Sequence, residues 1–175
     1  SASKKKSKTD PPFMRAALAL ARRGLGSTWP NPTVGCVLVA DGHVVGRGWT
    51  QPGGMPHAET IALERAGNRA RGATAYVSLE PCSHYGKTPP CADALVAAGI
   101  SRAVLAMQDP NPDIDGRGID KLKAAGVDVE LGLMEAEARK VNAGFSLMVE
   151  RGRPLVTLKT ATTLDGRIAV SSGAS

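Results

Sequence analysis

Hydrophobic positions in the first fifty residues follow a helical spacing and then a strand spacing. Apolar residues recur every three or four positions over 14–25, which predicts a helix. A continuous apolar run over 34–39 predicts a buried strand, and the Asp41-Gly42 pair predicts a tight turn into a second strand at 43–46. These two strands should therefore pair antiparallel.

From residue 57 onward the pattern alternates between helix and strand. Helices are predicted at 57–66, 91–98 and 117–125, with a last helical stripe over 134–148, and strands at 73–79, 103–107 and 127–131. Strands separated by helices of this length usually pair in parallel, with helices on both faces of the sheet. We therefore predict a three-layer α/β/α domain over 11–150, with a mixed sheet of about five strands.

The ends of the chain fall outside this pattern. Four lysines in residues 1–10 supply much of the net charge of +6, which predicts a disordered basic leader and not a nucleic-acid groove. At the other end, Gly152 and Pro154 end the last helix, and 155–158 predicts a further strand. Because a lone strand cannot bury its own surface, 151–175 is either an added edge strand or the start of a second domain.

Composition excludes several kinds of function. Aromatic residues make up only 3% of the chain, which argues against a stacking surface for single-stranded nucleic acid. No apolar run approaches the roughly 18 residues that cross a membrane, and the charged N-terminus is not followed by the apolar core of a secretory signal. A cytoplasmic, reducing setting is therefore expected.

The three cysteines, Cys36, Cys82 and Cys91, cannot all pair within the chain. In a reducing compartment, neighbouring cysteines are better explained as metal ligands or as a reactive site than as a disulfide. Cys36 lies within the first predicted strand and is expected to be a small buried hydrophobic residue.

His57, Cys82 and Cys91 together supply three ligands suited to zinc and leave one tetrahedral position open. Three protein ligands with an open position are typical of a catalytic zinc, which makes hydroxide available near neutral pH. Residues i and i+2 do not share a helix face, so His57 and Glu59 can reach one ion only in the first turn of a helix. Glu59 could there carry a proton from the attacking water to a leaving nitrogen.

Two other interpretations of these residues remain open. Cys82 and Cys91 could form a disulfide, although a reducing compartment disfavours one. The zinc could instead be purely structural, which would require a fourth ligand, and His84 could serve as that ligand.

The spacing of these residues is close to a known signature. Zinc deaminases carry His-x-Glu followed by Pro-Cys-x-x-Cys, whereas eight residues separate the two cysteines here. That loop contains a histidine, a lysine and hydroxyl side chains, and could bind a phosphate or a ribose. The string Glu80–Cys91 closely resembles the deaminase domain of the bifunctional riboflavin-biosynthesis deaminase/reductase family, as do the stretches 30–35, 56–59 and 109–112.

This resemblance implies a cytidine-deaminase-like fold and assigns roles to particular residues. It implies zinc (Zn²⁺) bound by His57, Cys82 and Cys91, with Glu59 as the proton shuttle. The residues that it places against the substrate are Asn31, His84 and Lys87, the last two near its phosphoribosyl part. Where the family often carries a histidine, seven residues before the zinc histidine, this sequence has Thr50.

The resemblance also implies the reaction. It is the hydrolytic deamination of 2,5-diamino-6-(5-phosphoribosylamino)pyrimidin-4-one to the corresponding 5-aminouracil derivative, carried out by an enzyme that could be a homo-oligomer. Residues 153–167 are similar to the opening of the family's dihydrofolate-reductase-like domain, which uses NADPH, and Ala161 and Ser175 fall near its cofactor and substrate positions. A chain ending at Ser175 could not build that pocket, so no reductase activity is expected from it.

Two other functions remain open. The chain could be a cytidine, deoxycytidylate or tRNA-adenosine deaminase, although those relatives more often carry a short Cys-x-x-Cys, and tRNA binding would call for a more basic surface. It could also be a zinc-stabilised interaction module without catalysis, in which case removal of the metal should unfold it.

Overall fold

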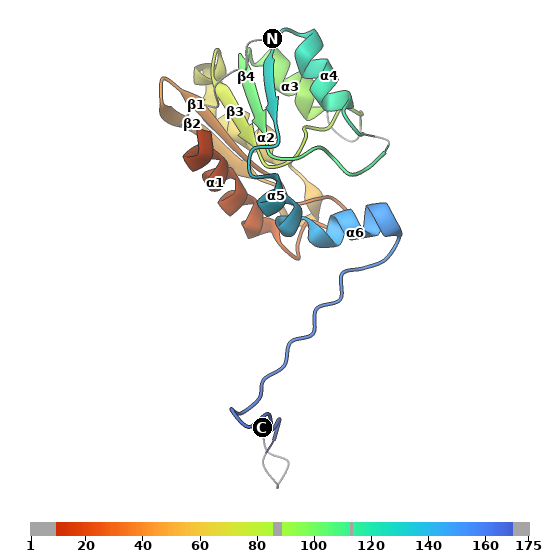
Figure 1. Ribbon diagram of the computed structural model, residues 1–175. Coiled ribbons are helices and arrows are strands. Elements are labelled where there is room, and N and C mark those ends of the chain that lie inside the picture. Colours follow the sequence, from red (N-terminus) through yellow and green to blue (C-terminus); the bar gives the residue numbers. More distant parts are fainter. Residues whose placement is uncertain (1–9, 86–88, 113, 170–175) are drawn as a thin grey trace, which may run out of the picture.

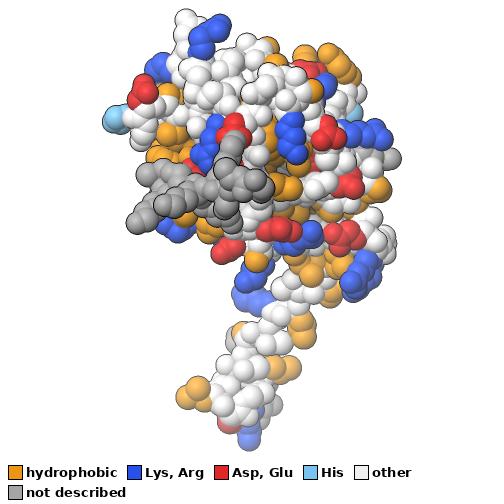
Figure 2. Space-filling model, turned by 45° about the horizontal axis from the view of Figure 1, so that its top comes forward, with side chains coloured by type: hydrophobic (Ala, Val, Ile, Leu, Met, Phe, Trp, Pro, Cys, Tyr) orange, Lys and Arg blue, Asp and Glu red, His pale blue; other side chains and the backbone are white. Residues whose placement is uncertain are grey.

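The computed structural model describes residues 10–85, 89–112 and 114–169 (Figure 1). Residues 1–9 of the predicted basic leader at 1–10 lie outside these residues. The prediction is wrong for Asp10, which is the buried first residue of a helix. Within the described residues no helix is both long enough and apolar enough to cross a membrane. On the face drawn in Figure 2, Lys and Arg side chains are interspersed with Asp and Glu and do not form a continuous basic surface.

The described residues contain a mixed five-stranded sheet with the order β2-β1-β3-β4-β5. Its strands are β1 (Gly35–Ala40), β2 (His43–Trp49), β3 (Thr74–Val77), β4 (Arg102–Leu105) and β5 (Asp128–Leu131). β1 is antiparallel to both β2 and β3, whereas β3, β4 and β5 are parallel to one another. The predicted hairpin and the predicted mixed sheet are both confirmed.

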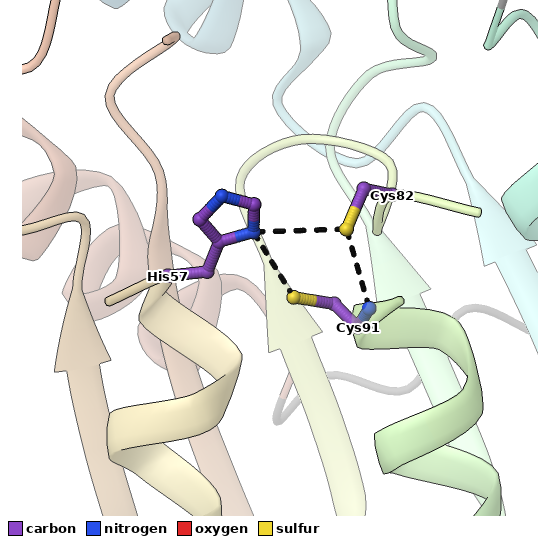
Figure 3. Close-up of side chains that lie close together, drawn as sticks. All are labelled: His57, Cys82 and Cys91. Carbon is purple, nitrogen blue, oxygen red and sulfur yellow. Dashed lines mark hydrogen bonds between the residues drawn. The ribbon is translucent and has the colours of Figure 1, made fainter. Parts of the chain in front are cut away.

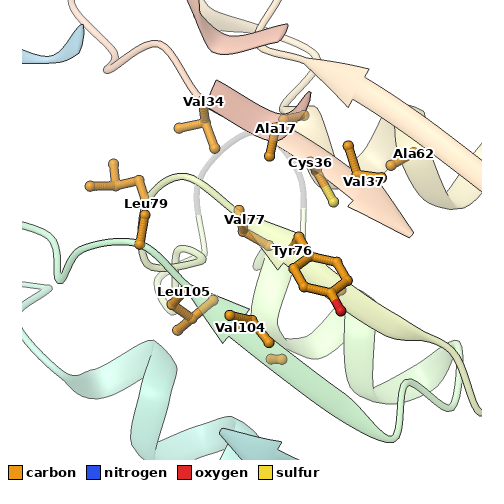
Figure 4. Packing of buried hydrophobic residues seen from close by; sticks show 14 of the residues in the cluster. Ala17, Val34, Cys36, Val37, Ala62, Tyr76, Val77, Leu79, Val104 and Leu105 are labelled. Carbon is orange, nitrogen blue, oxygen red and sulfur yellow. The ribbon is translucent and has the colours of Figure 1, made fainter. Parts of the chain in front are cut away.

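Helices cover both faces of the sheet, which gives the three predicted layers (Figure 1). On one face α1 (Asp10–Ala21) packs against β1 and contacts α5 (Glu135–Val141). On the other, α2 (Ala58–Ala66) lies on β1 and β2, followed by α3 (Cys91–Ala97) and α4 (Arg117–Ala124). The core between these layers is aliphatic: Val37, Val77 and Leu105 are almost fully buried (Figure 4). Cys36 is also fully buried, as expected.

Glycines on β2 bring α2 close to the sheet. A Cβ atom at Gly46 would collide with the backbone oxygen of Ala62, and one at Gly48 with that of Ala58. Because both strand residues lack a side chain, the helix rests directly on the strand backbone. The first turn of α2 is thereby held near the C-terminal end of β3, a central strand of the sheet.

The C-terminal part differs from the sequence prediction in two places. The stripe over 134–148 is not one helix, because Asn142 separates α5 from α6 (Ala143–Arg151). The Asn142 side chain is buried and clamps the backbone of Thr33: its Oδ1 accepts the Thr33 N–H and its Nδ2 donates to the Thr33 carbonyl, each at 3.0 Å. The predicted strand at 155–158 is exposed chain that leads away from the domain (Figure 1), because no strand among the described residues pairs with it.

Candidate metal centre and active site

Two helix N-termini and one loop bring three candidate metal ligands together. His57 is the residue immediately before α2, in an extended backbone conformation, and Cys91 is the first residue of α3. Cys82 lies on the loop that follows β3, and its carbonyl accepts the N–H of Ala92 at 3.1 Å. Figure 3 shows the three side chains pointing toward one another from these separate elements.

The spacing of the three donor atoms fits a zinc ion. His57 Nδ1 lies 3.3 Å from Cys91 Sγ and 3.6 Å from Cys82 Sγ, and all three donors lie within 4.8 Å of one another. A nitrogen and a sulfur bound to one tetrahedral zinc at the usual bond lengths lie roughly 3.6 Å apart. Histidine nitrogen and cysteine sulfur are also the donors that zinc prefers. The residues present therefore fit the metal that the sequence predicted.

The two cysteines are free thiols, so the disulfide alternative is not adopted. Hydrogen bonding from the Cys91 thiol, with contributions from His57 and the Cys91 N–H, lowers the pKa of Cys82 to about 4. The same shared hydrogen bond raises the pKa of Cys91. The Cys91 N–H also donates to Cys82 Sγ at 3.2 Å. A thiolate, which is the form that binds metal, is thus stabilised at this site.

His84 does not join this group, which has three members among the described residues. Its side chain is exposed and lines the neighbouring cavity instead. A purely structural zinc would need a fourth protein ligand, which His84 does not supply here. A tetrahedral ion on these ligands would keep one position for water, as a catalytic site requires.

Glu59 lies in the first turn of α2, two residues after His57, and is only 3% exposed. Burial is the main reason that the pKa of its carboxyl rises from the usual 4.5 to about 7, and the nearby Cys82 thiolate adds to the increase. A carboxyl group with a pKa near neutrality can both accept and release a proton at physiological pH. This is the property that the sequence analysis assigned to Glu59.

The raised pKa of Glu59 predicts a pH-dependent stability of the metal-free protein. Between pH 4.5 and 7 the folded protein holds a proton on Glu59 that the unfolded chain has released, so stability falls as pH rises. The metal-free Glu59→Gln variant should lack this loss. Its free energy of unfolding, relative to that of the metal-free wild type, should therefore increase by about 3 kcal/mol between pH 4 and pH 8. Urea unfolding of both metal-free proteins across this range measures the difference. Glu64→Gln, at an exposed position on the same helix, is the control; an unchanged pH slope in Glu59→Gln would contradict the assignment.

A cavity of about 470 Å³ opens beside the three ligands. Residues from five parts of the chain line it: Pro30, Asn31, Pro32, Val34, Thr50, Gly53, Met55, His57, Glu59, Leu79, Glu80, Cys82, His84, Asp109, Asn111, Ile114 and Phe145. It has the size of a small-ligand site, with apolar walls and a few polar groups that converge near the metal ligands. The metal centre and Glu59 thus lie on the wall of a space that can hold a nucleotide.

The residues expected to contact substrate fall in different places. Asn31 lines the cavity with its Nδ2 donating to the Gly54 carbonyl at 2.9 Å, and His84 lines it as well. Lys87 lies outside the described residues, and so does Ser175. Ala161 lies on the exposed segment after α6 and is not among the residues that line the cavity. The substrate and cofactor roles of these residues stay predictions.

Thr50 occupies the position at which the resembled family often carries histidine. Its side chain is buried, and its hydroxyl oxygen accepts the N–H of Val34 at 2.9 Å. The residue therefore ties the end of β2 to the start of β1, and it also lines the cavity.

The sequence analysis gave no role to several residues of this site. Asp109 and Asn111 line the cavity, and only the resemblance of 109–112 marked them. Burial is the main cause that raises the pKa of Asp109 to about 6. Phe145 belongs to the apolar helical stripe predicted over 134–148, and it also lines the cavity. Glu80 belongs to the motif string, but nothing in its spacing indicates what it binds.

Comparisons with known proteins agree with this geometry. Residues 7–107 match the family model for the cytidine and deoxycytidylate deaminase zinc-binding region. The chain is 56% identical over 163 residues to riboflavin biosynthesis protein RibD of Escherichia coli K12, covering 93% of this chain and 44% of that protein. The chain thus spans less than half the length of this relative.

Two solved structures are similar to the whole described fold. A structure of Acinetobacter baumannii RibD has a TM-score of 0.86 and 53% identity, over 96% of this chain and 48% of that one. A Thermotoga maritima diaminohydroxyphosphoribosylaminopyrimidine deaminase/5-amino-6-(5-phosphoribosylamino)uracil reductase has a TM-score of 0.88 and 44% identity, over 95% of this chain and 48% of that one.

Proposed function

Since this chain belongs to the cytidine and deoxycytidylate deaminase zinc-binding family, we propose that it deaminates the diaminopyrimidine nucleotide of riboflavin biosynthesis. The observation that carries the proposal is the convergence of His57, Cys82 and Cys91 beside the buried Glu59 at one cavity wall. The substrate is 2,5-diamino-6-(5-phosphoribosylamino)pyrimidin-4-one, in agreement with the deaminase/reductase name of a relative with 44% identity.

The proposed reaction exchanges an exocyclic amine for an oxygen. The oxygen of water bonds to the ring carbon that bears the amine, the carbon–nitrogen bond then breaks, and ammonia leaves as a ring carbonyl forms. No oxidant or reductant is needed, because the ring carbon keeps its oxidation state. The product is 5-amino-6-(5-phosphoribosylamino)uracil.

The chain's own residues account for the proton transfers and for substrate binding. His57, Cys82 and Cys91 would hold the zinc ion, which supplies Lewis-acid activation of water when bound. The Glu59 carboxylate accepts one proton from the attacking water and passes it to the ring nitrogen, then takes the second proton from the added hydroxyl group and passes it to the departing amine. The same carboxyl group serves in both directions, because it gives up each proton that it accepts.

The rest of the cavity determines which nucleotide binds. Asn31 and His84 lie on its lining, and with Lys87 they are proposed to bind the pyrimidine and its phosphoribosyl group. The loop after Cys82 contains the cation Lys87 together with hydrogen-bond donors, and such groups suit a phosphate. The proposal also assumes a cytoplasmic, reducing setting, because a site built on two thiolates needs both cysteines reduced.

Ammonia release tests the substrate assignment. The zinc-loaded protein should release ammonia from the diaminopyrimidine nucleotide with a kcat/KM at least about 100-fold above that for cytidine or deoxycytidine monophosphate, because the cavity's polar groups would stay unpaired with those nucleotides. Coupled detection of ammonia with each nucleotide measures this ratio. Equal or greater turnover of the cytidine nucleotides would contradict the proposal in favour of the second deaminase class.

The proposal for the segment after α6 rests on the greater length of the relatives. This chain covers 44% of the E. coli protein, and we propose that in a longer protein residues 151–175 would open a reductase domain that uses NADPH, with Ala161 at its cofactor site. A homo-oligomer is likewise part of the proposal.

A further inference from the structure

A buried carboxylate on the loop after β3 binds four backbone N–H groups. Glu80 is 3% exposed. Its Oε1 accepts the N–H groups of Gly118 at 2.8 Å and Ile119 at 3.2 Å, and its Oε2 accepts those of Asp109 at 3.2 Å and Gly116 at 3.1 Å. A carboxylate has about four lone-pair sites, so Glu80 has no acceptor capacity left for a substrate. Its role must therefore be exerted through the groups it binds.

Those groups delimit one wall of the cavity. We call residues 109–112 and 114–116 the wall segment; Asp109 and Gly116 are its ends, and both donate to the same Glu80 oxygen. Asn111 and Ile114 lie between these ends and line the cavity. The segment is braced internally as well, because Asp109 Oδ1 accepts the Asn111 N–H at 2.9 Å.

The same carboxylate joins the wall segment to the metal side of the cavity. Glu80 is separated from the metal ligand Cys82 by Pro81 alone. A Cβ atom at Gly118 would collide with the Pro81 carbonyl oxygen, so the start of α4 rests against the backbone that leads into the ligand. The position of the wall segment relative to Cys82 thus depends on the Glu80 side chain and on the close contact between Gly118 and Pro81.

We propose that Glu80 is a positioning residue that holds the wall segment at the spacing from the metal ligands at which the cavity binds its nucleotide. This inference rests on the function proposed above. The hydrogen bonds described for the Glu80 carboxylate go to the wall segment and to the start of α4, and none of them goes to His57 or Glu59. Loss of Glu80 should therefore weaken substrate binding and leave the proton shuttle working.

Glu80→Gln keeps the shape of the side chain and replaces one acceptor oxygen by an amide NH₂, which faces two N–H donors. KM for the diaminopyrimidine nucleotide should rise by at least about tenfold because the wall shifts, while kcat stays within about threefold and the zinc content stays unchanged. Tyr76→Phe is the matched control. It removes a buried hydrogen bond to Asp10 Oδ1 of 2.7 Å, at a residue that does not line the cavity, and should lower the melting temperature with KM unchanged.

A readout that does not depend on activity separates this inference from the proposed function. Amide hydrogen exchange in Glu80→Gln should quicken across the wall segment and at the start of α4, and stay unchanged in α2. If the wild type fails to deaminate while exchange behaves in this way, the proposed substrate is wrong and the positioning role stands.

Three results would overturn the positioning role. They are a lowered melting temperature with unchanged KM, a loss of zinc, or unchanged exchange in the wall segment. Glu80→Asp, whose carboxylate is one methylene shorter, keeps the test available if the glutamine variant does not fold, and a wild-type KM in that variant would equally reject the inference.

Discussion

Replacing Glu59 by glutamine should lower kcat for deamination by about 10³-fold or more while zinc remains bound stoichiometrically. Glutamine has the same shape and can still hydrogen-bond, but it cannot accept a proton from water or deliver one to nitrogen. Because Glu59 is buried at the cavity wall, bulk water cannot easily take over either transfer. Steady-state ammonia release together with metal analysis measures the effect.

The control for this substitution is Glu64→Gln, the same chemical change at an exposed position of α2. It should leave kcat and zinc content unchanged, which excludes a general effect of removing a carboxylate from that helix. Retention of more than about a tenth of wild-type kcat in Glu59→Gln would mean that another group moves the protons. A simultaneous loss of zinc would instead make Glu59 a metal ligand, an assignment that the spacing of His57 and Glu59 alone does not exclude.

The residues of the candidate site could be picked out from the sequence because their signal is local. His57 and Glu59 are two positions apart, and Cys82 and Cys91 stand at the two ends of one short loop. Zinc chemistry limits which side chains can act together, so a few residue types at short spacing are informative. The strands and helices around them followed from apolar periodicity in the same way.

The residues that shape the cavity could not be predicted, because their partners are distant in the sequence. Asn142 clamps the backbone of Thr33 across 109 positions, and Glu80 binds N–H groups 29 to 39 positions away. Within an apolar stripe, Asn142 looks like an ordinary polar position of a helix, although it is where α5 ends and α6 begins. Periodicity reports which face of an element is buried and gives no information on which backbone groups a buried polar side chain will meet.

At 155–158 the sequence predicts a strand that the structure does not form. The composition of this segment is that of a strand, yet the segment is exposed chain in the structure. Strand formation depends on a neighbouring strand that can supply hydrogen bonds, and local composition does not provide one. Local pattern therefore predicts elements well only when the partner of each element is present.

Replacing Cys82 by alanine should abolish zinc binding and deamination together, because two ligands cannot retain the ion in a catalytic geometry. Cys36→Ala is the matched control: it makes the same chemical change at a cysteine that is fully buried within β1. The control should lose about 1 kcal/mol of stability from the small cavity left behind, and keep its zinc and most of its kcat. Metal analysis, ammonia release and urea unfolding of both variants provide the comparison.

The stability of Cys82→Ala then distinguishes an enzyme from a zinc-stabilised module. The aliphatic core lies between the sheet and the helices and includes Val37, Val77 and Leu105, so its burial does not depend on the metal. We therefore expect metal-free Cys82→Ala to unfold cooperatively, at a lower midpoint than the zinc-loaded wild type and close to that of the chelated wild type. A chain that loses its fold on chelation, as small zinc domains do, would show that the ion holds the structure together, as expected of a zinc-stabilised module.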